Sequence, residues 1–211
     1  MAEISLNNID AFIINDAEGT KYYGGNQKWF VGKDYAKEAA CGATTCANIL
    51  GYLSKRDEEY KGVCKFDTTS KDDFTEFMKA IYPFVKPGLI GIMPADFIKG
   101  AKDYARTCGI EISRELMTVP AAKGKRPSYD YMVRWISAAI EDDLPVAFLN
   151  LSSGRIKNLD GYHWVTVVAI DIDEKRIKIV DNGNLLDVDI SKWLKRSTMG
   201  GAFVILEAYE G

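Results

Sequence analysis

The second half of the chain is a succession of apolar segments of strand length, joined by short turns. These segments cover residues 145–151, 163–172, 176–180, 185–190 and 201–206. The turn between the second and third is only Asp173-Glu174-Lys175. Strands joined by turns this short pair antiparallel, because a parallel pairing needs a crossover of a dozen or more residues. The pattern therefore predicts a mostly antiparallel sheet, which the strand 201–206 closes.

The first half favours helices instead. Four are predicted: one from Cys41, one over 71–81 behind the cap Ser70, one over 94–108 that opens on Pro94, and one from Ser128 to about residue 141. The predicted fold class is therefore α+β, a helical lobe packed against an antiparallel sheet. We expect one domain over residues 1–211, with the helical lobe at about 35–142 and the β lobe at about 145–209.

Composition excludes several classes of function. The 211 residues are 47% hydrophobic and 27% charged, as in an ordinary soluble globular protein, and the net charge is −3. The densest basic stretch, 123–126, is typical of a solvated loop, so no nucleic-acid partner is expected. No apolar run is long enough for a membrane span, and residues 1–8 lack a signal-peptide pattern. Cytoplasmic and mature secreted forms both stay open, and no pattern indicates the oligomeric state.

The cysteines do not predict a metal site. The chain has four, at positions 41, 46, 64 and 108, with no Cys-x-x-Cys pair and a single histidine, so their spacing fits no zinc motif. Four cysteines in a chain of this length are also too few for a disulfide scaffold. We expect Cys46, Cys64 and Cys108 to be buried or free thiols. No metal or organic cofactor is predicted.

Cys41 has the surroundings of a nucleophile. A thiol becomes a useful nucleophile as the thiolate, and the start of a helix favours this anion through unpaired N–H groups and a partial positive charge. Gly42 follows and leaves room for a substrate beside the sulfur. A small buried side chain is the alternative interpretation of the same residue.

His163, the only histidine, stands where a buried strand begins. Asp181 lies 18 residues further on, the separation of a two-strand hairpin that returns to its starting point. The carboxylate is therefore predicted to accept a hydrogen bond from the imidazole, which would set its tautomer and support its charge. Asn182 is the competing candidate, and Asp-Asn-Gly is also an ordinary turn sequence. A structural histidine is the alternative for His163.

Acyl transfer also needs hydrogen-bond donors for the oxyanion. The backbone N–H of Cys41 is one candidate, because it lies beside the attacking sulfur. A polar side chain usually supplies the second donor. Gln27, within Gly24-Gly25-Asn26-Gln27-Lys28-Trp29, is the best amide upstream of the cysteine, with an ordinary surface glutamine as the alternative.

Taken together, these motifs resemble the papain-like cysteine peptidase superfamily, and most closely its bacterial branches of the kind that include the bacteriocin-leader-processing peptidases. The resemblance rests on short motifs at 24–29, 41–48, 162–167 and 180–181. It implies a papain-like fold with Cys41 as nucleophile, His163 as general base and acid, Asp181 as orienting residue and Gln27 as oxyanion donor. The Cys41–His163 separation of 122 is that of a compact relative.

Two departures from the family pattern stand out. The oxyanion glutamine of papain-like enzymes usually lies six residues before the cysteine, where this chain has Tyr35; Gln27 lies fourteen before. The papain and cathepsin sequence around the nucleophile is matched only over Cys41-Gly42-Ala43, before Thr44 and Thr45 follow.

The sequence thus predicts a thiol-dependent hydrolase, a cysteine peptidase acting on a peptide or amide substrate through an acyl-enzyme. A transglutaminase-like or amidase-like acyl transfer uses the same three residues, so it stays open. A papain-like fold kept as an inactive binding module or effector is the third alternative, favoured by the displaced glutamine. Arg155 and Lys157 precede the histidine and hint at an acidic ligand, with a solvated loop as the plainer interpretation.

Overall fold

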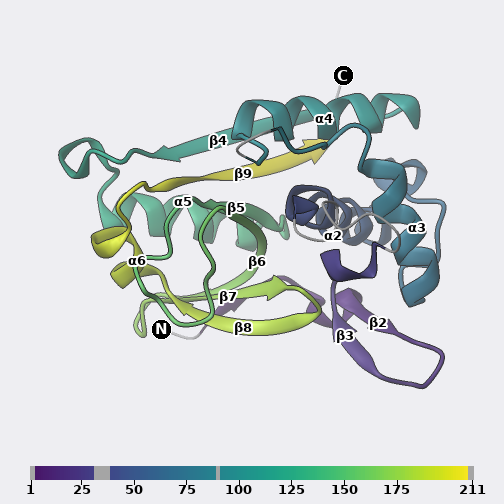
Figure 1. The fold of residues 1–211 in the computed structure, drawn as a ribbon, viewed down its shortest axis with the longest axis horizontal. Coiled ribbons are helices and arrows are strands. Elements are labelled where there is room, and N and C mark those ends of the chain that lie inside the picture. Colours follow the sequence, from purple (N-terminus) through teal and green to yellow (C-terminus); the bar gives the residue numbers. More distant parts are fainter. Residues whose placement is uncertain (1–2, 31–38, 89–90, 209–211) are drawn as a thin grey trace.

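The computed structural model describes residues 3–30, 39–88 and 91–208. Over these residues most of the helices lie at one end and one edge of a large antiparallel sheet, while α5 packs against the central strands (Figure 1). The helices are α2 (Cys41–Arg56), α3 (Lys71–Ile81), α4 (Pro94–Thr107), α5 (Tyr129–Glu141) and α6 (Ile190–Arg196). Short 3₁₀ turns are η1 (Ile9–Phe12), η2 (Gln27–Trp29), η3 (Glu58–Val63) and η4 (Lys123–Lys125).

Among the described residues, seven strands form the main sheet, in the order β4-β9-β5-β6-β7-β8, with β1 also paired to β6. Every pairing in it is antiparallel. The strands are β1 (Ile4–Ser5), β4 (Ile112–Val119), β5 (Val146–Asn150), β6 (His163–Asp171), β7 (Arg176–Asp181), β8 (Asn184–Asp189) and β9 (Gly201–Ala208). A separate antiparallel pair joins β2 (Ile13–Asn15) and β3 (Lys21–Tyr23).

The predicted α+β class is confirmed, and so are the four predicted helices within one or two residues. Local signals explain this accuracy. Ser70 and Ser128 each cap their helix by accepting a hydrogen bond from the backbone N–H three residues on, and Pro94 occupies the first turn of α4. The predicted helical region begins at residues 35–38, which lie outside the described residues.

Three features differ from the expectation. The helical region contains a strand, β4, which pairs with β9 along the sheet edge. Only Ile112, Met117 and Val119 of its eight residues are buried, so its apolar residues are too few to give a strand pattern. The strand β9 does not end the sheet but lies between β4 and β5. Residues 190–196 form α6 where no helix was expected, and Asp189 caps it by accepting a hydrogen bond from the Lys192 N–H.

The core lies where the central strands meet the helices. All of β5 and all of β6 up to its last residue are buried, which is the signature of strands covered on both faces. The helices α2 and α5 both pack against β6, and α4 packs along β4 and β9. In α2, every residue from Cys41 to Leu53 is buried. The first turn of α2 is therefore held against the beginning of β6 by the core itself. No helix of the described ranges combines the length and the apolar character needed to cross a bilayer.

Candidate active site

The predicted nucleophile is the first residue of α2. Cys41 is only 9% exposed, and its backbone N–H belongs to the first turn, whose N–H groups have no acceptor within the helix. Gly42 is tightly packed: a Cβ built there would lie 2.6 Å from Cγ2 of Ile92. Only glycine lets the residue-92 segment approach the helix so closely. In this structure Gly42 therefore serves packing at the start of α2.

The predicted base, His163, is the first residue of β6. His163 pairs with Asn150 of β5 and is 7% exposed. The next side chain, Trp164, stacks on Phe97 with ring centroids 4.3 Å apart, and its indole N–H donates to the Ile92 carbonyl at 2.9 Å. These contacts lock the beginning of the strand into the core, so the imidazole has a defined position.

Asp181 ends β7 beside the imidazole. Its Oδ1 lies 2.7 Å from Nε2 of His163. The register explains the contact: Thr166 pairs with Val180, so Asp181 falls opposite Val165, two residues from His163 on the same face of the sheet. Diagonal neighbours of this kind are within reach of long side chains. Because a carboxylate only accepts, Nε2 carries the proton, and Nδ1 is left for the sulfur.

Asn182, the alternative to Asp181, has another task. It forms the two-residue turn between β7 and β8 together with Gly183, and both have positive φ (47° and 82°), as a type I′ turn requires. Its backbone carbonyl accepts from Nδ2 of Asn26 at 3.0 Å. The sequence allowed Asp-Asn-Gly to be either an ordinary turn or the partner of His163. In the structure both hold: Asn182 and Gly183 form the turn, and Asp181 contacts the imidazole.

The three residues form one chain of contacts in a small recess. Cys41 and His163 both line this recess, and the Cys41 side chain is close enough to His163 to contribute to the shift in its pKa. Burial disfavours the imidazolium and would lower the pKa of His163, but the hydrogen bond and negative charge of Asp181, together with the interaction with Cys41, outweigh it and raise this pKa from 6.5 to about 10. Nine residues line the recess: Cys41, Thr44, Thr45, Asn48, His163, Trp164, Val180, Asp181 and Asn182. Larger hollows lie elsewhere between the described residues, but this small one brings together a thiol, an imidazole and a carboxylate.

Gln27 lies at the edge of this recess in spite of its distance from Cys41 along the chain. Its backbone N–H approaches Oδ1 of Asn182 at 3.4 Å, and Asn182 lines the recess. The side-chain oxygen of Gln27 is buried and has no hydrogen-bond partner among the described residues. Tyr35, at the position where the family pattern expects the glutamine, lies outside those residues.

Asn48, which the sequence analysis did not single out, connects the parts of the site. It is 3% exposed, its Oδ1 accepts from the Gly25 N–H at 2.8 Å, and its Nδ2 donates to Oγ1 of Thr166 at 3.4 Å. It therefore joins α2, β6 and the segment that leads to Gln27. A signal was available: an asparagine inside an apolar helix, seven residues and so two turns after Cys41, lies on the same helix face.

The remaining cysteines have different surroundings. Cys46 is fully buried, and burial raises the pKa of its thiol. Cys64 and Cys108 are partly buried, and all four cysteines are unbridged. Across residues 3–30, 39–88 and 91–208, no cluster of three or more histidine, cysteine or acidic side chains is placed to hold a metal ion.

Comparison with known proteins was made by sequence and by structure. No family model matches the chain, and no curated protein matches it significantly. Among solved structures it is similar to the peptidase domain of Streptococcus ComA, a bifunctional ABC transporter involved in a quorum-sensing pathway, with 12% identity, a TM-score of 0.45, and coverage of 82% of this chain and 93% of that one.

Two further structures are similar over comparable lengths. One is the N-terminal peptidase C39-like domain of the toxin secretion ATP-binding protein from Vibrio parahaemolyticus, with 11% identity, a TM-score of 0.36, and coverage of 78% of this chain and 97% of that one. The other is the Pseudomonas avirulence protein AvrPphB, with 12% identity, a TM-score of 0.38, and coverage of 83% and 95%.

Proposed function

We propose that this chain is a cysteine peptidase, a thiol-dependent hydrolase in which Cys41 is the nucleophile, His163 the general base and acid, and Asp181 the residue that orients the imidazole. The observation that carries the proposal is the chain of side-chain contacts from Cys41 through His163 to Asp181 in one recess. A buried histidine with a raised pKa, placed between a thiol and a carboxylate, is the arrangement that activates a thiolate.

In the proposed mechanism, His163 takes the proton of Cys41, and the thiolate attacks the carbonyl carbon of the scissile amide. The imidazolium then donates its proton to the leaving amine, which departs as the C–N bond breaks and an acyl-enzyme forms. Water, deprotonated by the neutral imidazole, attacks the thioester and releases the carboxylic acid and the thiol. Asp181 holds Nε2 throughout and supports the positive charge of the ring.

The developing oxyanion needs donors near Cys41. The backbone N–H of Cys41 is free of the helix ladder, and we assign it the first place. We assign the second to the side-chain amide of Gln27, because the Gln27 backbone N–H approaches Oδ1 of Asn182, a residue of the recess wall. Removal of one such donor costs about 10²- to 10³-fold in kcat. Gln27→Ala should therefore lose activity by that factor while the fold is retained.

Two variants and one chemical label test the proposal. Cys41→Ala and His163→Ala are expected to abolish peptide hydrolysis with unchanged circular dichroism, and Cys46→Ala, a change of the same kind on the same helix, to retain it. Iodoacetamide should modify Cys41 before the three other cysteines, measured by peptide mapping. Unchanged hydrolysis in Cys41→Ala would overturn the assignment. Failure to label Cys41 preferentially would favour the inactive binding module.

Product analysis separates the peptidase from other acyl transfer. The same three residues form an acyl-enzyme whether water or an amine accepts the acyl group, so the products decide. With a peptide substrate and an added primary amine, we expect the free acid to dominate. An amide of the added amine as main product would identify a transglutaminase-like enzyme.

A further inference from the structure

A cluster of cationic side chains lines a hollow away from the catalytic recess. A cavity of about 460 Å³ opens between the loop 151–162, the outer ends of β7 and β8, and α6. Five cations line it: Arg155, Lys157, Arg176, Lys192 and Arg196. The two carboxylates on its wall are Asp187 and Asp189. The cavity thus carries a net charge of +3 in a chain whose net charge is −3.

Most of this positive charge is not neutralised within the protein. Asp189 is engaged by α6: its Oδ1 accepts from the Lys192 N–H, and its Oδ2 pairs with Lys192 Nζ at 2.6 Å. The other four cations form no ion pair with the described residues, and Asp187 is the one remaining acid on the wall. Four exposed cations around a single carboxylate repel one another, so a bound anion lowers the energy of the arrangement.

The loop that contributes Arg155 and Lys157 is held in place. Ile156 is 9% exposed and Leu159 6%, so both anchor the loop in the core. Nδ2 of Asn158 donates to the Asp187 carbonyl at 3.0 Å, which ties the loop to β8. Gly154 packs against the end of α6, where a Cβ would come within 2.8 Å of the Ser197 nitrogen. The cations from the loop, β7 and α6 therefore already face the cavity, so the binding of a ligand requires little loss of conformational entropy from the loop.

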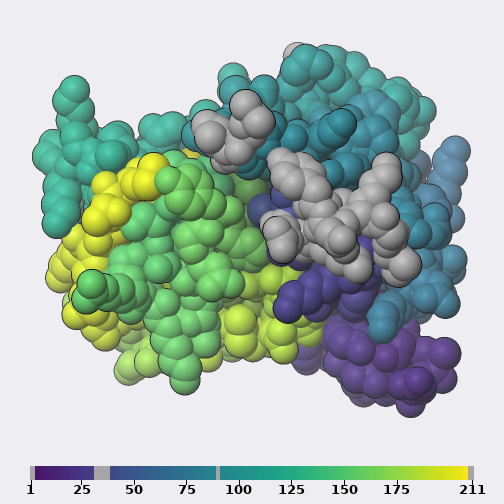
Figure 2. Space-filling model, in the orientation of Figure 1, coloured from purple at the N-terminus to yellow at the C-terminus, as the bar shows by residue number. Residues whose placement is uncertain are grey.

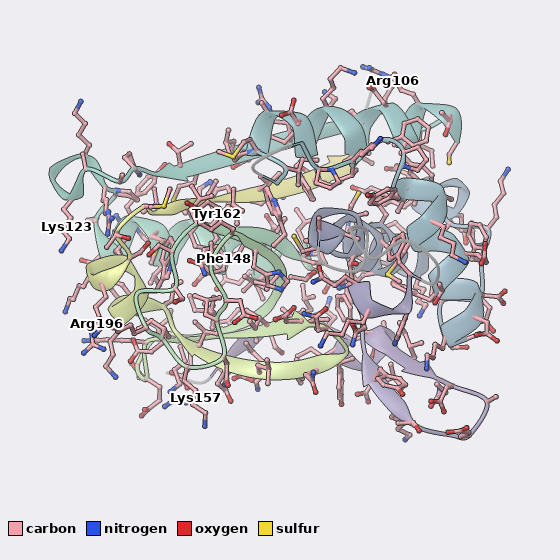
Figure 3. The ribbon with its side chains drawn as sticks, in the orientation of Figure 1. Arg106, Lys123, Phe148, Lys157, Tyr162 and Arg196 are labelled. Atoms are coloured by element: carbon pink, nitrogen blue, oxygen red, sulfur yellow. The ribbon has the colours of Figure 1, made fainter. Side chains whose placement is uncertain are left out.

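Two segments run from the cavity to the catalytic recess: the loop 151–162, which precedes His163, and the strand β7, which ends at Asp181. The loop 151–162 leads directly into His163, and it lies on the face shown in Figure 2, in green. Lys157 and Arg196 lie toward the end of the molecule opposite α3 (Figure 3). Along β7, Arg176 and Asp181 are five residues apart, which is about 17 Å at the rise of a strand. A peptide bound in both places would span the distance with about five extended residues.

We propose that this cavity, the basic pocket, is an exosite that binds an acidic segment of the peptide substrate. Its ligand is a run of glutamate or aspartate side chains about five residues from the cleaved bond. Guanidinium forks bind carboxylates with two parallel hydrogen bonds, and the pocket offers three arginines on separate elements, which suits several carboxylates along an extended chain. That the ligand is a peptide rests on the proposed peptidase function; that it is anionic rests on the pocket alone.

The test measures binding independently of catalysis. The probe is a capped, fluorescent hexaglutamate peptide, titrated by anisotropy at low salt into the full-length Cys41→Ala protein, with hexalysine and hexaglutamine as comparison peptides. We expect saturable binding of hexaglutamate only, weakened by added salt. The variant Arg155→Gln/Lys157→Gln/Arg196→Gln should bind hexaglutamate roughly tenfold or more weakly, because it removes three charge pairs at once, each of which is weak alone.

A matched variant controls for net charge. Lys61→Gln/Lys79→Gln/Lys99→Gln removes the same charge from exposed side chains on η3, α3 and α4, and it should keep hexaglutamate binding within about twofold. Equal losses in both triple variants, or no binding to the parent protein, would overturn the exosite. Tighter binding of a six-nucleotide oligothymidine than of hexaglutamate would overturn the peptide assignment. If hexaglutamate binds but no peptide is cleaved, the proposed function fails and the anionic site stands.

Discussion

The two halves of the candidate active site are placed by different physical means. His163 and Asp181 belong to one hairpin, 18 residues apart, and the antiparallel register between β6 and β7 brings them together. Cys41 arrives on a helix from far away in the sequence, and it is placed by packing against the residue-92 segment and by the polar link through Asn48. The hairpin half is thus a local construction, whereas the helix half depends on contacts between distant segments. Substitutions in the hairpin half should mainly lower peptide hydrolysis, whereas substitutions in the helix half should mainly lower the stability of the fold.

Among substitutions that leave both Cys41 and His163 in place, the largest effect is expected in the hairpin half. Asp181→Ala removes the only acceptor on Nε2 of His163 among the described residues and should lower kcat/KM by about 10³- to 10⁴-fold. Asp181→Asn keeps an oxygen that can accept the hydrogen bond, and it should recover part of the loss, which separates orientation from charge. The control is Asp96→Asn on α4, an exposed carboxylate that lines neither the recess nor the cavity at Arg155, and no change in peptide hydrolysis is expected from it. An Asp181→Ala enzyme with near-native kinetics would refute the role of the carboxylate.

The pH dependence of stability tests the same interaction without catalysis. Because the pKa of His163 is raised from 6.5 to about 10, the folded protein keeps a proton that the unfolded chain releases between these values. The stabilisation is therefore complete below pH 6.5 and is lost as the pH rises through about 10. The unfolding free energy of the native protein should exceed that of His163→Gln by on the order of 3 kcal/mol at pH 6. Denaturant titrations at pH 6, 8 and 10 should show this difference shrinking; a constant difference contradicts the raised pKa.

A smaller effect is expected in the helix half at Asn48. Asn48→Ala leaves the Gly25 N–H and the Thr166 hydroxyl without their partner, and this should cost about 1–3 kcal/mol of stability. If Asn48 positions the site, kcat should also fall by about tenfold with little change in KM. Asn48→Asp retains the acceptor for Gly25 and should restore part of kcat.

Ser137→Ala is the matched control for Asn48. The Ser137 hydroxyl is buried in α5 and has no hydrogen-bond partner among the described residues, so its removal should change neither the stability nor kcat much. A drop in stability with unchanged kcat in Asn48→Ala would make Asn48 a structural residue only.

The smallest effect concerns the start of α2. Gly42→Ala places a methyl group 2.6 Å from Cγ2 of Ile92, and the overpacking should cost about 1–3 kcal/mol in thermal or denaturant unfolding. Gly51→Ala in the same helix meets no atom nearer than 3.4 Å, and it should be neutral or raise the stability by up to about 1 kcal/mol. Equal effects of the two substitutions would show that packing at Gly42 does not place Cys41.

The accuracy of the sequence-based expectations follows the same division between local and distant contacts. The helices α3 and α5 begin at capping serines, and α4 begins at a proline. The hairpin of β6 and β7 contains a short polar turn. These are local features of the sequence, so the sequence predicts all four elements. The local sequence does not predict the strand β4, because its partner, β9, is more than eighty residues away and most of its own side chains are exposed or half-buried. Gln27 was named as an upstream amide, but only the turn at Asn182 shows how it reaches the recess.

The sequence by itself determined the α+β class, the helix at Cys41, and the hairpin that offers Asp181 to His163. Periodicity, caps and turn residues are local properties, and each of these features is local. Only the tertiary structure decided that Cys41 meets His163, that Asn48 joins three segments, and that one cavity is surrounded by four cations with no ion pair among the described residues. The physical reason is that such contacts join residues far apart in the chain, and they exist only when the core has brought helix and sheet together.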